Sequence, residues 1–132
     1  IVGFPGETSN NFYETLDFLS MLEISYCHVF PYSERQNTDA LQITQKLSKT
    51  IITERRNIIH QLSNNKKHQF YKNNIGKLQK VLIENWENDI LYGLSENYIP
   101  IKICGEFSEI NQIIKIKLNE IQGNRMLGER LN

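Results

Sequence analysis

The residue types best suited to ligand chemistry stand in two short loops, each of which follows an expected strand. Glycines and a carboxylate follow residues 1–2, and a phenol, a hydroxyl and a guanidinium follow residues 24–30; they are Gly3, Gly6, Glu7, Tyr32, Ser33 and Arg35. Glycine lets the backbone approach a ligand closely, and arginine grips carboxylates in a two-pronged fashion. In α/β barrels the loops after the strands hold the active site. The pattern predicts a small-molecule site, although glycines after a strand are also common in plain turns.

A second set of candidates lies on the outward faces of strands expected in the C-terminal half, or, for Tyr92 and Asn97, near those faces. It combines basic, aromatic and amide side chains: Tyr92, Asn97, Tyr98, Lys102, Lys115 and Lys117. Lysines contact phosphates and aromatic rings stack on bases, so the set suits RNA. Because the chain has 15 basic and 15 acidic residues, a local patch must supply the attraction. The alternative is that exposed strand lysines only discourage edge aggregation.

The cysteines do not suggest a metal site. Cys27 and Cys104 stand far apart and neither belongs to a CxxC pair. His28 follows Cys27, but no further ligands lie at zinc or iron–sulfur spacing. We therefore expect no metal ligand in this chain, and Cys27 is expected to be a small buried thiol on a strand.

A strand, a helix and a second strand are expected to position the two N-terminal loops. Residues 1–2 end one strand, Thr8 or Ser9 caps a helix that runs to about residue 22, and residues 24–30 form the second strand. Two strands joined by a helix make a parallel, right-handed βαβ unit. Alone, the unit exposes strand edges, so we expect it to need the missing N-terminal part of the same protein, or to self-associate.

The remaining sequence predicts a connecting helix and a small barrel. Residues 45–73 have helical spacing, with Ile51 and Ile58 on the apolar stripe and Arg55 on a polar, solvated face. The period then becomes alternating, and the strand candidates are residues 78–84, 90–94, 98–103, 113–118 and 125–129. Such strands suggest a closed or partly open barrel similar to an OB fold, with Pro100 at an edge or bulge. The expected organisation is an α/β fragment (1–44), a connecting helix (45–74) and an all-β five-stranded barrel (75–132).

The sequence has no segment that predicts a membrane-spanning helix. No stretch has the roughly 20 apolar residues that a membrane span needs. The chain starts at Ile1 without a signal peptide. From these features we expect a fragment of a cytoplasmic protein.

Several motifs, in order along the chain, resemble the radical-SAM methylthiotransferases. Ile-Val-Gly-Phe-Pro-Gly-Glu-Thr (1–8) resembles a late barrel strand of that family, and residues 28–40 resemble its YSxRxGTxA loop. Asn37 replaces the usual Gly of that loop, and Asn tolerates a left-handed backbone. Glu54-Arg55 is similar to the family's recurring Lys-Glu-Arg, and residues 93–101 resemble its closing TRAM domain.

The resemblance implies the last βαβ part of a radical-SAM partial barrel followed by a TRAM domain that binds the tRNA anticodon stem-loop. The family uses two [4Fe-4S] clusters and S-adenosylmethionine to methylthiolate C2 of a modified adenosine beside the anticodon. The resemblance also implies that Gly3, Gly6 and Glu7 shape the S-adenosylmethionine end of the barrel. Tyr32, Ser33 and Arg35 would lie near the substrate or close the barrel.

The branch within the family and the state of this chain are separate expectations. His-Val-Phe-Pro-Tyr-Ser (28–33) resembles most the branch acting on threonylcarbamoyladenosine; the isopentenyladenosine and ribosomal-protein branches stay open. The family's CxxxCxxC and its three N-terminal cluster cysteines are absent. We therefore expect the chain to carry no catalytic residue, to be inactive alone and to have no cofactor bound. The alternative is a free-standing RNA-binding TRAM adaptor.

Overall fold

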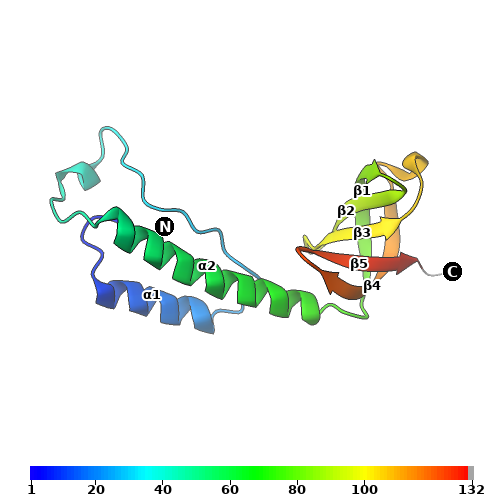
Figure 1. Cartoon of the computed structure of the whole chain (residues 1–132), viewed down its shortest axis with the longest axis horizontal. Helices are drawn as coiled ribbons and strands as arrows, with labels where there is room; N and C mark the ends of the chain where they lie inside the picture. Colours follow the sequence, from blue (N-terminus) through cyan, green and yellow to red (C-terminus); the bar gives the residue numbers. More distant parts are fainter. Residues whose placement is uncertain (131–132) are drawn as a thin grey trace. The chain divides into compact units, whose positions relative to one another are not determined.

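A computed structural model describes residues 1–130, and the chain divides into two compact units, Ile1–His68 and Gln69–Asn132. The helices are α1 (Ser9–Met21) and α2 (Lys49–Lys72), with short 3-10 turns η1 (Asp39–Gln42) and η2 (Phe107–Glu109). The strands are β1 (Leu78–Glu87), β2 (Ile90–Ser95), β3 (Pro100–Cys104), β4 (Ile113–Gln122) and β5 (Arg125–Arg130) (Figure 1). Within the described part of the chain, no helix combines the length and apolar character that a membrane crossing requires.

Helix α1 begins where the sequence predicted. The Thr8 hydroxyl accepts a hydrogen bond from the backbone N–H of Asn11, and the Asn11 side chain accepts one from the backbone N–H of Thr8, which completes a capping box. The apolar face of α1 packs on α2, with buried Phe12 and half-buried Leu16 against Ile59. Local capping and amphipathic spacing thus agree, and the expected N-cap is confirmed.

The parallel order of the expected βαβ unit holds, but residues 24–30 do not form a regular strand. The two segments meet at one parallel bridge, Val2 with Pro31. The Val2 N–H donates to the Phe30 carbonyl (2.9 Å), and the Tyr32 N–H donates to the Val2 carbonyl (2.7 Å). A ladder needs several paired residues on a neighbour, and among residues 1–130 only Val2 supplies backbone pairing here. The segment is therefore extended but mostly unpaired.

The long helix is confirmed, but its buried stripe lies about one residue away from the expected one. Arg55, Ile59 and Ser63 are buried at four-residue spacing, whereas Ile51 is exposed. The expectation that Arg55 lies on a solvated face is wrong. Its side chain is buried because polar partners around α1 satisfy the guanidinium, as buried charges require.

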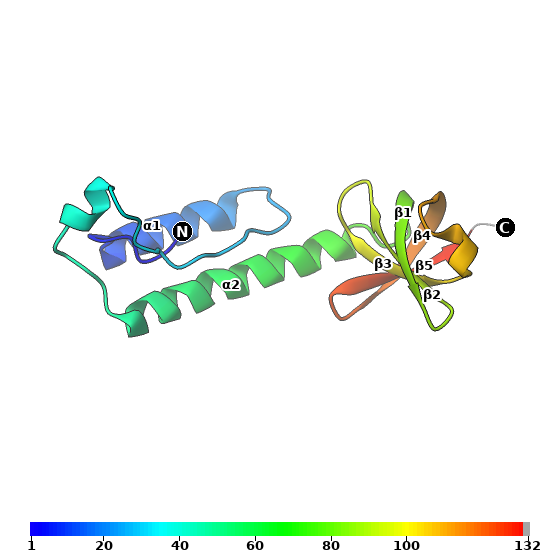
Figure 2. The same ribbon diagram turned by 90° about the horizontal axis from the view of Figure 1, so that it is seen from above.

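The C-terminal unit is a closed five-stranded barrel in the order β1-β2-β3-β5-β4 (Figure 2). Strands β3 and β5 pair in parallel, and the other neighbours are antiparallel. Inward residues fill the interior: Val81, Ile83, Leu91, Ile101, Ile103, Ile116, Leu118 and Met126. Five strands form as expected, but β3 begins at Pro100 and not at residue 98, so Tyr98 lies in the preceding loop and not on a strand. Strands β1 and β4 continue past a register shift to residues 87 and 122. Pro100 is the first residue of β3, where a missing N–H is tolerated.

Candidate functional site

The Val2–Pro31 bridge brings the two predicted N-terminal loops together, but not all of their side chains. The half-buried Tyr32 ring packs edge-on against Phe4, with 5.1 Å between ring centroids. Ser33 and Arg35 are exposed further along the loop, where the Arg35 carbonyl accepts a hydrogen bond from the Thr38 hydroxyl (2.8 Å). Of Tyr32, Ser33 and Arg35, only Tyr32 therefore contacts the Gly3–Glu7 loop.

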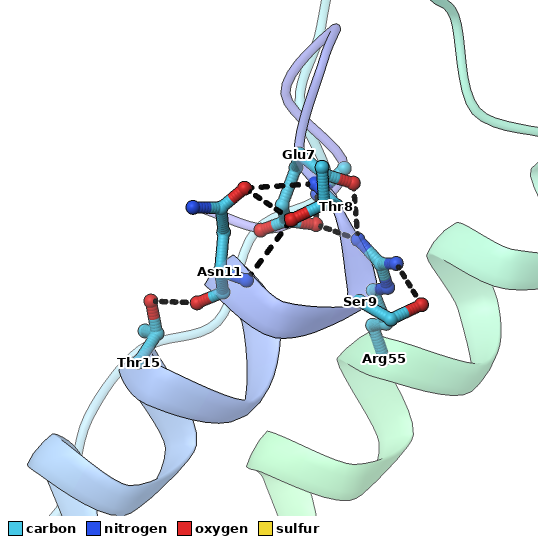
Figure 3. Close-up of polar contacts among 7 residues, drawn as sticks. Glu7, Thr8, Ser9, Asn11, Thr15 and Arg55 are labelled. Atoms are coloured by element: carbon cyan, nitrogen blue, oxygen red, sulfur yellow. Dashed lines mark hydrogen bonds and ion pairs between the residues drawn. The ribbon is translucent and has the colours of Figure 1, made fainter.

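The carboxylate of Glu7 is held by groups of this chain (Figure 3). Its Oε2 accepts hydrogen bonds from the Gly3 N–H (3.0 Å) and from Nη1 of Arg55 (2.6 Å). The same guanidinium donates to the Glu7 carbonyl (2.9 Å) and lies 5.2 Å from the centre of the Phe12 ring. The side chains of Arg55 and Glu7 are only 9% and 14% exposed. Glu7 therefore stabilises the entry to α1 through a nearly buried ion pair.

The backbone conformation of this loop explains why glycine occupies positions 3 and 6. Both have positive φ, 78° at Gly3 and 85° at Gly6, a region that side chains rarely adopt. A Cβ on Gly3 would also lie 2.6 Å from Cγ1 of Ile52 on α2. Asn37, which stands where the resemblance expects glycine, has φ 61°. The left-handed turn is thus retained with Asn, as expected.

Two polar residues of α2, which the sequence analysis did not single out, complete this unit. The Ser63 hydroxyl accepts from the Cys27 N–H (2.9 Å) and donates to the Cys27 carbonyl (2.8 Å). The Lys66 ammonium donates to the carbonyls of Ser20 (2.9 Å) and Leu22 (2.8 Å) at the end of α1, where a positive charge is favourable. The signal for Ser63 was its four-residue spacing from Ile59 and Arg55.

The described residues do not assemble a metal site. Cys27 is half-buried in the first unit, and Cys104 is exposed on the barrel. Among residues 1–130, no group of three or more His, Cys, Asp or Glu side chains is arranged to hold a metal ion.

The predicted RNA-binding residues of the barrel separate into different faces. Tyr92 on β2 pairs with Lys102 on β3. Lys115 and Lys117 lie on β4 and pair with Lys80 and Leu78 of β1. In the strand order, β5 separates β3 from β4 on one side, and β1 and β2 separate them on the other. The three predicted lysines therefore do not share a strand pair.

The polar and aromatic members of that set also differ in what surrounds them. The Arg125 guanidinium lies 5.0 Å from the centre of the half-buried Tyr92 ring. Asn97 is tied into its own loop, since its Oδ1 accepts from the Ser95 hydroxyl (2.6 Å) and its Nδ2 donates to Asn74 (3.2 Å). Tyr98, by contrast, is 73% exposed. Of the two tyrosines, Tyr98 presents the more exposed ring to a ligand.

The known proteins that this chain resembles are named as enzymes that methylthiolate tRNA. The threonylcarbamoyladenosine tRNA methylthiotransferase MtaB of Aquifex aeolicus is 42% identical over 117 residues, which are 88% of this chain and 27% of that protein. The protein of the same name from Rickettsia prowazekii is 39% identical over 126 residues, 96% of this chain and 28% of the relative. The tRNA-2-methylthio-N(6)-dimethylallyladenosine synthase of Acinetobacter baumannii is 32% identical over 136 residues, 100% of this chain and 28% of its own length.

The chain thus spans a little over a quarter of the length of these curated relatives. No protein-family model matches it.

Proposed function

Over most of its length this chain is homologous to the tRNA methylthiotransferases, and from that premise we propose that it is the C-terminal part of a threonylcarbamoyladenosine tRNA methylthiotransferase. Identity is 42% and 39% to two relatives named for that substrate and 31% to a third, against 32% to one named for dimethylallyladenosine. The run His-Val-Phe-Pro-Tyr-Ser at residues 28–33, which resembles the first branch, supports the same assignment.

The parent enzyme would use two [4Fe-4S] clusters and S-adenosylmethionine, but the described residues do not fit a cluster. Cysteine thiolates hold such clusters, and this chain has two cysteines, one in each unit. The Glu7 carboxylate, a candidate contact for S-adenosylmethionine, is engaged by Arg55 and the Gly3 N–H. We therefore assign no chemical step to these residues. Glu7 and Arg55 instead stabilise the loop at residues 3–7, which follows the extended residues 1–2.

The first unit would complete the catalytic barrel. Cys27 and Val29 face the core with α1 and α2, whereas the alternating residues Tyr26, His28 and Phe30 are exposed. Their rings contact one another along the segment, at centroid distances of 5.4 and 6.4 Å. In an α/β barrel the helices cover the outside, so this uncovered aromatic face would point to the interior that the rest of the enzyme encloses. In isolation the same surface would favour self-association.

The second unit would bind tRNA. Its closed barrel has a core of its own and exposes lysines and Tyr98 on the outside, which suits phosphate contact and base stacking. A free-standing RNA-binding adaptor is the other candidate. Similarity over 117 residues exceeds the length of either unit, and this favours a part of the larger enzyme.

A chimera tests the assignment to the threonylcarbamoyladenosine branch. This chain replaces the matching segment of the Aquifex aeolicus relative, and mass spectrometry measures methylthiolation of tRNA carrying threonylcarbamoyladenosine or dimethylallyladenosine. We expect product only from the first tRNA. A matched chimera carries the Acinetobacter baumannii segment, and product from dimethylallyladenosine alone with our chain would contradict the branch.

Binding of this chain to an anticodon stem-loop, at low and raised salt, tests the role of the barrel. We expect binding that weakens with salt, because phosphate contacts release counterions. The same measurement on a Lys102/Lys115/Lys117→Ala triple variant shows how much of the binding these three predicted lysines supply. Absence of binding at low salt would overturn the tRNA-binding role of this barrel and move recognition to the remaining part of the enzyme.

A further inference from the structure

The loop between β2 and β3 holds Tyr98 in an unusual backbone conformation. Its φ is 62°, which is uncommon for a bulky residue and points to a functional constraint. Buried bonds maintain the loop: the Tyr98 N–H donates to the Ser95 carbonyl (2.9 Å), and the Ile99 N–H donates to the Ser95 hydroxyl (2.9 Å). Asn97 then ties the loop to Asn74 (3.2 Å). The ring nevertheless stays in solvent, so the loop presents it without packing it.

The Tyr98 ring lies at a groove of about 410 Å³ on the outside of the barrel. Two apolar side chains from neighbouring strands contribute to its wall, Leu82 of β1 and Ile113, its direct partner on β4. They are 42% and 68% exposed. Together with Tyr98 they form an exposed apolar surface in the groove, which we call the Tyr98 groove.

Positive charge stands at the next outward position of the same two strands. Lys80 on β1 is paired directly with Lys115 on β4. Like charges in this arrangement repel each other, and within residues 1–130 neither ammonium has a carboxylate within ion-pair distance. An anion between the two lysines would remove the repulsion. Lys80 also lines the Tyr98 groove, which places the anion site beside the apolar surface.

Two exposed carboxylates, Glu84 and Glu96, line the groove as well. Among residues 1–130, Lys80 is the one lysine that lines the groove, and the two carboxylates are balanced only when Lys115, its partner on β4, is counted as well. This face therefore has no excess positive charge with which to hold the continuous backbone of a duplex. Duplex RNA is recognised largely through its shape and its phosphate and 2′-hydroxyl contacts, whereas unpaired bases stack on aromatic side chains. The combination of an exposed ring, two aliphatic side chains and one lysine pair therefore fits a single unpaired nucleotide.

We propose that the Tyr98 groove binds an unpaired RNA nucleotide, with its base on Tyr98, Leu82 and Ile113 and its phosphate between Lys80 and Lys115. This inference rests on the proposed tRNA-binding role and names the part of the RNA that the barrel takes. It also separates this face from that of Tyr92, whose ring already has the Arg125 guanidinium over it. Lys80 and the two aliphatic residues are additions to the residues that the sequence indicated.

The test measures binding of the whole chain to a short single-stranded RNA, to the same RNA annealed to its complement, and to an anticodon stem-loop. Tyr98→Asn removes the ring while keeping a residue that tolerates the left-handed backbone. We expect it to weaken single-strand binding by about tenfold, the usual effect of losing one stacked base. Lys80→Gln with Lys115→Gln should lower the slope of log affinity against log salt by about 0.7, the value for one phosphate of a single strand.

The matched control carries Lys72→Gln and Lys77→Gln, two exposed lysines that do not line the groove. It removes the same charge and should leave the affinity for the single strand within about twofold, since exposed charges outside a site contribute little. Circular dichroism verifies that each variant folds. Tight duplex binding with weak single-strand binding overturns the inference. Stem-loop binding that survives Tyr98→Asn and the Lys80/Lys115 change, but is lost in a Lys102→Gln/Lys117→Gln variant, overturns the inference while leaving the proposed function in place. Absence of binding to every RNA overturns both.

Discussion

The guanidinium of Arg55 lies 2.6 Å from the carboxylate of Glu7, across 48 residues of sequence. This pair joins the loop before α1 to the first half of α2, and both side chains are nearly buried. Further along α2, Lys66 binds the carbonyls at the other end of α1. One helix thus satisfies polar groups at both ends of its neighbour.

Removing one partner of the Glu7–Arg55 pair should loosen the first unit. Arg55→Met leaves the Glu7 carboxylate nearly buried without its counter-charge, and we expect a local destabilisation of about 3 kcal/mol. Hydrogen exchange of peptides covering residues 1–22 measures it. The double variant with Glu7→Gln should recover part of the loss. Lys46→Ala, at the exposed ion pair with Glu34, is the control and should change nothing; an Arg55→Met protein with native exchange would contradict the prediction.

The hydroxyl of Ser63 makes the two hydrogen bonds to the Cys27 backbone that a neighbouring strand would otherwise make. Removing this hydroxyl should therefore expose the Cys27 N–H and carbonyl to solvent. Ser63→Ala leaves the Cys27 N–H and carbonyl without their partner, at a cost of about 2 kcal/mol. We expect faster exchange of the amide of Cys27. Ser20→Ala, on the exposed face of α1, serves as the comparison, and equal behaviour of the two variants would show that the Ser63 bonds contribute little.

Gly93 allows β1 and β2 to approach closely in the barrel wall. A Cβ at this position would overlap the backbone carbonyl of Leu82, which cannot move aside. Gly93→Ala should therefore lower the free energy of unfolding of the barrel by about 2 kcal/mol or more. Denaturant unfolding followed by fluorescence of Trp86, the single tryptophan, measures this. Gly123→Asn provides the contrast, because that turn has φ 63° and open space around it; a native midpoint for Gly93→Ala would refute the argument.

The ion pair between Glu109 and Arg130 should make the stability of the barrel depend on pH. The Arg130 guanidinium, 2.6 Å away, and the Glu106 backbone N–H hold the pKa of Glu109 below its ordinary value of 4.5. A carboxyl whose pKa is lowered by folding stabilises the fold above its unfolded pKa, and the stabilisation is lost as pH falls through the folded pKa. Glu109→Gln should therefore lower the unfolding midpoint at neutral pH and match the native chain well below pH 4.5. An offset that persists in acid would point to packing instead.

The amino-acid sequence by itself determined the elements of this protein. The Thr8 cap, the left-handed Asn37 and the five alternating strands were all predictable, because capping, turn conformation and side-chain alternation depend on residues a few positions apart. The motifs at residues 1–8 and 28–40 likewise pointed to the methylthiotransferases before any fold was known. These are local properties, and they survive in a chain that spans about a quarter of its relatives.

Only the tertiary structure decided which side chains meet. Helical periodicity placed Arg55 in solvent, since a guanidinium is buried only when a partner distant in sequence neutralises it. Similarly, alternation put Lys102, Lys115 and Lys117 on outward faces but could not show that β5 lies between β3 and β4. The register that sets Lys80 opposite Lys115 depends on the closure of the whole barrel. Such contacts form between segments dozens of residues apart, so no local pattern records them.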